Sequence, residues 1–172
     1  MVEDSKKVVD EVDFLVKTSE TGKYGGKKLT ASQIRQYKGE LKQNGVEVFF
    51  EKDLKLNSFD RIKNKAAVKK FIPFTVDGIK FETIQDFYFF MRQDGYLGAF
   101  HAETNQLFLT ENPTRYLAFH EKTHVKHFLE VGSQYHNLPS WEKETYVFKE
   151  IWINKHQWTQ IELSHALVMF QS

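Results

Sequence analysis

The sequence predicts an α+β fold, in which a small antiparallel sheet or paired hairpins carry a long central helix and C-terminal helices. Short runs rich in aromatic and β-branched residues flank turn signals at Asp77-Gly78 and at Asn105, which predicts hairpins. In the second half of the chain, apolar residues recur every three to four positions, which predicts helices. Strands that precede a group of helices are typical of the α+β class.

The composition limits the classes of partner and of metal site. A chain of 172 residues can bury one sizeable core, and its formal net charge of +1 gives no strong field for nucleic acid or a membrane surface. No run approaches the roughly 18 apolar residues that a membrane span needs. The chain has no cysteine, so any metal site must use histidine and carboxylate ligands.

The first 27 residues are expected to stand apart from the rest of the chain. Residues 1–19 have the pattern of an amphipathic helix, and a linker rich in glycine and lysine follows them. This helix can be the tail of a preceding segment rather than part of the core. We therefore expect residues 1–27 to be an N-terminal helix and linker, and residues 28–172 to be the main domain.

Short elements are expected after the linker. A helix begins at Thr30 and ends near Asn44-Gly45, and residues 46–50 follow as a strand. The lysine-rich residues 51–70 hold few apolar side chains, which predicts a surface loop with a short helix.

Two hairpins and a helix complete the first half. Residues 71–81 are predicted to form a hairpin, and residues 83–91 a short apolar helix. Residues 95–102 and 106–110 form the second predicted hairpin, with Asn105 in its turn.

The longest predicted helix opens the second half. Pro113 and then Thr114, as N-cap, form a start signal, and Gly132 suits the left-handed position after the helix end. Spacings of three and four residues give this helix one inward stripe, made of Tyr116, Leu117, His120, His124, Phe128 and Val131.

This helix contains the sequence His120-Glu121-Lys122-Thr123-His124, an HExxH motif. Histidines four residues apart leave the same face of a helix, so both rings can bind one Zn²⁺. Glu121 points about 100° round the helix, where it can act on a metal-bound water without binding the metal. We interpret His120 and His124 as zinc ligands and Glu121 as the catalytic base.

A catalytic zinc site needs a third protein ligand. His127 lies on the same helix, three residues beyond His124, and is expected to be a neighbour of the site rather than a ligand. His136, in the loop that follows, remains possible.

The helix predicted after Pro139 is the better source of this ligand. On a helical wheel, Glu144 falls on the same side as the apolar residues, whereas Glu142 falls about 100° from Trp141. A buried carboxylate needs a partner such as a metal, so we favour Glu144 over Glu142. The apolar residues that define this side are Trp141, Phe148, Ile151 and Trp152.

Two features remain open at the end of the chain. Tyr135, His136 and Tyr146 are candidate oxyanion donors that the sequence does not rank. A last helix is predicted to start at Trp158-Thr159, with Ile161, His165, Leu167 and Val168 on its inner face and His165 packed rather than bound to metal.

Residues 115–128 and 141–148 resemble the zincin-like metallopeptidase toxin domains of bacterial polymorphic and contact-dependent inhibition toxins. The resemblance begins near Lys28 and covers most of the chain. It implies a gluzincin-like zinc peptidase that is the effector domain of a larger secreted toxin. Such a domain is delivered into the target cell, where we expect it in the cytoplasm, and a cognate immunity protein neutralises it.

The resemblance also bears on single residues. A glutamate after the second histidine is the usual third ligand in this class, which leaves Glu142 and Glu144 both open. Residues 1–27 would then belong to the delivery region, and the substrate would be a protein or peptide of the target cell.

Two other classes of function stay open. One is a non-catalytic zinc-stabilised binding module, which a closed four-ligand site that includes His127 or His136 would favour. The other is a metal-dependent nuclease effector, against which the near-neutral charge argues.

Overall fold

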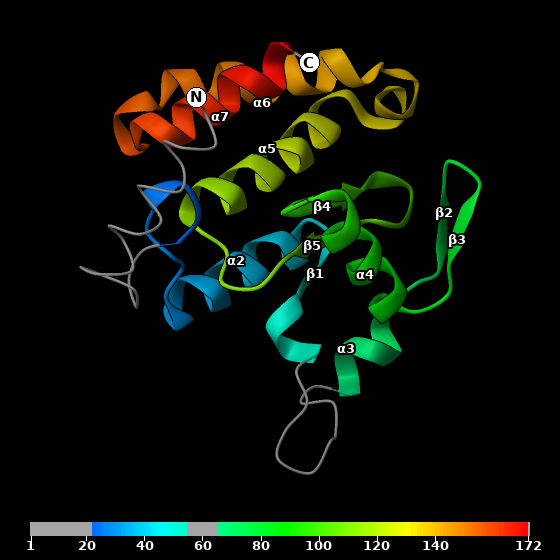
Figure 1. Cartoon of the computed structure of the whole chain (residues 1–172). Helices are drawn as coiled ribbons and strands as arrows, with labels where there is room; N and C mark the ends of the chain where they lie inside the picture. The colour runs from blue at the N-terminus through cyan, green and yellow to red at the C-terminus, as the bar shows by residue number, and fades with distance from the viewer. Residues whose placement is uncertain (1–21, 55–64, 172) are drawn as a thin grey trace. The chain divides into compact units, whose positions relative to one another are not determined.

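The computed structural model describes residues 22–54 and 65–171, and Figure 1 shows their helices and strands. The helix predicted over residues 1–19 lies outside the described residues, and the boundary after residue 27 stays a prediction. The chain forms two compact units. One joins Met1–Ile34 to Asn112–Ser172, and the other is Arg35–Glu111.

The unit Arg35–Glu111 contains a three-stranded sheet with the order β1-β5-β4. The middle strand, β5 (Gln106–Leu109), pairs in parallel with β1 (Glu47–Phe50) and antiparallel with β4 (Gly98–His101). The predicted hairpin of β4 and β5 is confirmed, and Asn105 has the left-handed conformation (φ 54°, ψ 47°) in its turn. The sequence predicts an antiparallel sheet, and the structure differs at β1, because the long connection from β1 to β5 allows parallel pairing.

A separate hairpin is formed by β2 (Phe74–Val76) and β3 (Ile79–Phe81). Its turn residues Asp77 and Gly78 both have positive φ, 50° and 81°, as the turn favoured in two-residue hairpins requires. The hairpin predicted from Asp77-Gly78 is therefore confirmed.

Helices border the sheet in this part of the chain. Before α2 (Ala31–Gln43), Thr30 and Gln33 exchange two hydrogen bonds of 2.9 and 3.1 Å, so a capping box opens the helix at its predicted start. The predicted surface segment 51–70 is described at its two ends, as a short 3₁₀ turn, η2 (Glu51–Leu54), and as α3 (Lys65–Lys70).

The core of this unit is aromatic. On α4 (Ile84–Asp94), the Tyr88 hydroxyl lies 3.0 Å from the carbonyl oxygen of Phe49 and 3.1 Å from that of Leu109, which holds α4 against β1 and β5. Phe108 of β5 is fully buried and contacts rings from β1, the hairpin and α4. The buried cluster consists of Phe49, Ala67, Phe71, Phe74, Phe81, Ile84, Phe87, Tyr88, Met91 and Phe108.

The other unit is built from three helices. They are α5 (Arg115–Val131), α6 (Ser140–Ile153) and α7 (Gln160–Gln171), and α6 packs against both α5 and α7 (Figure 1). Short 3₁₀ turns join them: η4 (Gly132–Asn137) and η5 (Lys155–Gln157). Within the described part of the chain, every helix is too short or too polar to cross a membrane.

The start and end of α5 follow local signals. Thr114 accepts a hydrogen bond of 3.2 Å from the Leu117 N–H, so the predicted N-cap is confirmed. Gly132 has a positive φ of 65°, but its ψ of −141° differs from the left-handed helical conformation that we expected. The chain leaves α5 at Gly132 and continues directly into η4.

The start of α7 is also confirmed, but its predicted inner face is not. Thr159 and Glu162 exchange hydrogen bonds of 2.9 and 3.0 Å and form a capping box. Leu167 and Val168 expose 42% and 53% of their surface, while Ala166 is buried. The expectation of an inner face through Leu167 and Val168 is wrong because this helix is apolar on nearly every side, so the spacing of apolar residues does not select one face.

Candidate metal centre

One face of α5 buries three ionisable side chains. His120 and His124 are one helical turn apart and expose only 7% and 8% of their surface, and Glu121 beside them exposes 7%. The predicted inward stripe is confirmed through His124, whereas its last two members, Phe128 and Val131, are only partly buried. Imidazoles that are turned away from solvent need a polar partner inside the protein.

Glu144 of α6 is that partner. Its Oε1 lies 3.3 Å from Nε2 of His124, and its Oε2 lies 3.6 Å from Nε2 of His120. One nitrogen or oxygen atom from each of the three residues lies within 4.8 Å of the others. Among the described residues, this is the group of histidines and carboxylates that comes close enough to hold one metal ion.

The face of α6 that carries Glu144 differs in part from the predicted one. The sequence predicts Trp141 and Trp152 inside, but they expose 67% and 45% of their surface. Ile151 is buried, as predicted, and Val147 is buried beside it; they follow Glu144 by seven and three residues. Trp141 lies in the first turn of α6, where a helical wheel based on apolar residues does not tell whether another element covers the side chain.

The surroundings fix distinct charge states for these side chains. Burial lowers the pKa of His120 to about 3, so its ring is neutral and able to bind a cation. Burial raises the pKa of Glu121 to about 7. Burial also opposes charge on His124, but its hydrogen bond with Glu144 and the nearby carboxylates outweigh this effect and raise its pKa. The pKa of Glu144 is lowered: burial acts against this, but its hydrogen bond with His124 prevails.

Tyr135 of η4 contacts His124 from the side of the ring opposite Glu144. Its hydroxyl lies 3.4 Å from Nδ1 of His124, on the side of the ring away from Glu144. A partner at Nδ1 fixes the orientation and the tautomer of a metal-binding histidine. Nδ1 of His120 is buried and has no hydrogen-bond partner among the described residues.

The other candidate ligands and donors lie outside the group. His127 is buried and stacks on Tyr146, with ring centroids 4.0 Å apart, so it is the packed neighbour that the sequence predicts. His136 is exposed and contacts the ring of Phe128. Glu142 is not part of the three-residue group in the described structure.

A tyrosine–histidine contact next to His120 is absent from the sequence prediction. The hydroxyl of Tyr116 lies 2.8 Å from Nδ1 of His165 on α7, and the ring of Tyr24 stacks on His165 with centroids 4.6 Å apart. The ring of Tyr116 also meets that of His120, at 6.4 Å. Tyr116 precedes His120 by one helical turn, so the spacing could have indicated the contact between Tyr116 and His120. It gives no indication of the contact between Tyr116 and His165.

The donor set fits a divalent transition metal. Two imidazole nitrogens and a carboxylate are the ligands that catalytic zinc sites use, and they leave a further position for water or substrate. Both imidazoles present Nε2 to the same carboxylate, and the adjacent Glu121 can exchange a proton near neutral pH. This arrangement can support metal-assisted hydrolysis.

Comparison with known proteins identifies a protein family. The family model described as metallopeptidase toxin 4 matches residues 15–171. No curated protein and no solved structure matches the chain. The matched residues include both segments that contribute to the His120, His124 and Glu144 group.

Proposed function

The chain belongs to the metallopeptidase toxin 4 family, and we propose that it is a zinc-dependent peptidase that acts as the toxic effector domain of a secreted bacterial toxin. The observation that carries this proposal is the convergence of His120, His124 and Glu144 beside the buried Glu121. We place this site in the zincin class with a third ligand from a glutamate.

In this proposal His120, His124 and Glu144 hold the ion. The neutral ring of His120 is ready to bind, while His124 must first release its proton. Zinc, when bound, supplies a Lewis acid that acidifies a water and polarises the peptide carbonyl. Tyr135 positions the ring of His124 through Nδ1.

Glu121 transfers the proton. Its carboxylate accepts a proton from the water as the water oxygen attacks the carbonyl carbon. It then returns the proton to the amide nitrogen as the carbon–nitrogen bond breaks, so Glu121 ends each cycle unchanged. Burial gives this carboxylate a pKa of about 7, and a base with a pKa near the working pH is the most effective in such a transfer.

The family name and the resemblance support further parts of the proposal. The substrate is a protein or peptide of the target cell, and the site of action is its cytoplasm after delivery as part of a larger secreted toxin. A cognate immunity protein protects the producing cell. The near-neutral net charge supports a protein substrate over a nucleic acid.

Glu121→Gln tests the proposal, because the amide keeps the size of the side chain and cannot accept the proton. We expect the variant to fold, to bind one zinc ion per chain by elemental analysis, and to lose toxicity when expressed in bacterial cytoplasm. Mass spectrometry of cells that express the parent chain should identify cleaved proteins, and these cleavage products should be absent from cells that express the variant. A variant that keeps full toxicity would show that Glu121 is not the base.

The same preparation separates the proposal from its competitors. Incubation with RNA and with DNA, each with and without a chelator, tests for a metal-dependent nuclease. Chelator-sensitive cleavage of either nucleic acid would overturn the peptidase proposal. Zinc binding without cleavage of any protein or nucleic acid would instead indicate a structural metal.

A further inference from the structure

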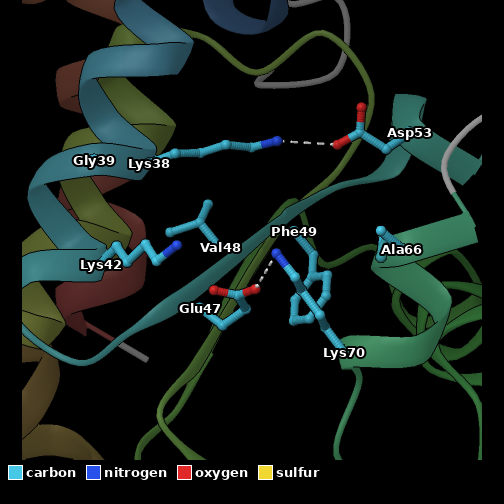
Figure 2. A pocket seen from close by; sticks show the side chains of 10 residues that line it. Lys38, Gly39, Lys42, Glu47, Val48, Phe49, Asp53, Ala66 and Lys70 are labelled. Atoms are coloured by element: carbon cyan, nitrogen blue, oxygen red, sulfur yellow. Dashed lines mark hydrogen bonds and ion pairs between the residues drawn. The ribbon is translucent and has the colours of Figure 1, made fainter.

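A basic pocket of about 240 Å³ lies in the unit Arg35–Glu111, and all of its lining residues belong to that unit. Figure 2 shows it between α2 and α3, with β1 passing between the two helices. Val48, Phe49 and Ala67 give it an apolar part, and none of the metal-centre residues lines it. The pocket is therefore a feature that the peptidase proposal does not use.

Three lysines surround this pocket, and two of them are paired. Lys38 forms an ion pair of 3.2 Å with Asp53, and Lys70 forms one of 3.3 Å with Glu47 (Figure 2). Lys42 lines the pocket from the last turn of α2, is exposed, and makes no ion pair with any described residue. The lining thus carries one positive charge in excess of its two carboxylates.

The outer edge of the sheet also lines the pocket, because the lining includes β1, which is an edge strand in the order β1-β5-β4. The Glu47 N–H donates to the carbonyl oxygen of Asn105, and the parallel register then turns the backbone groups of Glu47 and Phe49 toward β5. The N–H and C=O of Val48 consequently point away from β5. An edge strand with such groups is a template for a further strand.

We propose that this pocket binds an extended, acidic segment of a protein partner, which pairs with the edge of β1 at Val48 and places a carboxylate at Lys42. Each part of the pocket matches one feature of such a segment. The outward backbone groups of Val48 recognise a strand, the apolar part receives a side chain, and the unpaired ammonium of Lys42 recognises the carboxylate.

Lysines at a sheet edge have a second known effect, which is to keep other strands away. The two effects differ in their dependence on the charge of the incoming strand. A lysine that only protects the edge rejects strands of every composition, whereas a recognition site accepts an acidic strand and rejects a basic one. The charge of the probe therefore decides between them.

The test uses the full chain with the Glu121→Gln substitution, which allows its production, and two short capped peptides. One peptide alternates valine with glutamate and the other alternates valine with lysine. Binding is followed by NMR amide shifts and by hydrogen exchange at low salt. We expect the acidic peptide to shift and protect the Val48 amide, while the protection of the Phe49 amide, which faces β5, stays the same.

Two charge reversals on neighbouring helices complete the test. Lys42→Glu should weaken binding of the acidic peptide at least about tenfold, a difference of about 1.4 kcal/mol. Lys69→Glu makes the same charge change on α3 at an exposed residue outside the pocket lining, and should alter the affinity less than about twofold.

Three results would overturn the proposal. They are no shift of the Val48 amide at millimolar acidic peptide, equal binding of the basic peptide, and equal loss in the two lysine variants. None of these readouts depends on a bound metal or on catalysis, so the proposal can fail while the peptidase proposal stands, and the reverse.

Discussion

Glu144 Oε1 lies 3.3 Å from Nε2 of His124, so a carboxylate of α6 meets an imidazole of α5 on the side that His124 shares with His120. Neither helix holds the three side chains alone. The contact between α5 and α6 therefore creates the candidate metal centre, and residues of both helices should control metal binding.

Glu144→Gln should remove most of the metal affinity. The amide keeps the shape of the side chain but loses the charge and one strong acceptor oxygen. Because changes to groups that only support a ligand cost about 10- to 100-fold in affinity, we expect a loss beyond roughly 100-fold for the ligand itself. Zinc titration against a competing chelator measures it. Glu142→Gln, two residues away, is the matched control and should bind zinc like the parent chain; a loss in that variant alone would make Glu142 the third ligand.

Metal affinity should fall in acid because of His124. Its pKa is raised above the ordinary value of 6.5 in the metal-free protein, since Glu144 and nearby carboxylates outweigh the effect of burial. Zinc must displace this proton, so below the His124 pKa the apparent affinity should fall about tenfold per pH unit. His120, with a pKa of about 3, should add no such dependence above pH 5. Chelator competition from pH 5 to 8 checks the slope, and a flat profile over that range would contradict the role of His124.

Tyr135→Phe should weaken zinc binding by about tenfold, because it removes the hydroxyl that lies 3.4 Å from His124 Nδ1. The phenyl ring keeps the packing around His127 and Phe128. Tyr146→Phe is the control: the Tyr146 ring stacks on His127, and among the described contacts its hydroxyl has no bond to a proposed ligand. The two variants are compared by the same zinc titration. Equal affinities would mean that the Tyr135 hydroxyl does not position His124.

The sequence predicts local features well because neighbouring residues determine them. The helix starts at Thr30, Thr114 and Thr159 and the hairpin turn at Asp77-Gly78 depend on hydrogen bonds and φ values within four residues. The spacing of His120 and His124 is equally local, since one helical turn brings the two rings together.

Long-range features do not follow from neighbouring residues. The parallel pairing of β1 with β5 and the contact of Tyr116 with His165 each join distant segments, and no local signal encodes them. The helical wheel that favours Glu144 correctly puts Ile151 inside, but it also puts Trp141 inside, whereas Trp141 is exposed and Val147 is buried. A helix wheel reports which residues are apolar, but the neighbouring helix decides which of them it covers.

Glu162→Gln should stabilise the protein at alkaline pH. Glu162 is buried, and burial raises its pKa to about 7 from a reference value of 4.5. The folded state therefore binds this proton more tightly, so the contribution to stability is complete below pH 4.5 and is lost as the pH rises through about 7. Glutamine cannot ionise and keeps the capping box with Thr159. We expect a gain of about 1–2 kcal/mol at pH 8, after allowance for screening, and none at pH 4.

Urea unfolding of metal-free protein at the two pH values measures this difference. Glu162→Ala, which loses the capping box, should be destabilised at pH 4 and thereby shows that the cap contributes independently of charge. A gain for Glu162→Gln that is equal at pH 4 and pH 8 would refute the titration of Glu162.

Gly26→Ala should destabilise the unit that holds the metal centre. A Cβ at Gly26 would lie 2.0 Å from Oε2 of Glu162, and the carboxylate is fixed by its bonds to Thr159. The side chain must move out of its buried position and release the cap, which we expect to cost about 1–3 kcal/mol in the free energy of unfolding. Gly39→Ala provides the control, because no atom of the described residues lies within 4 Å of its Cβ position on α2, and alanine favours a helix by about 0.5–1 kcal/mol. Urea unfolding at pH 7 should thus separate the two variants in opposite directions. A stable Gly26→Ala variant would mean that the Glu162 carboxylate does not occupy the space beside Gly26.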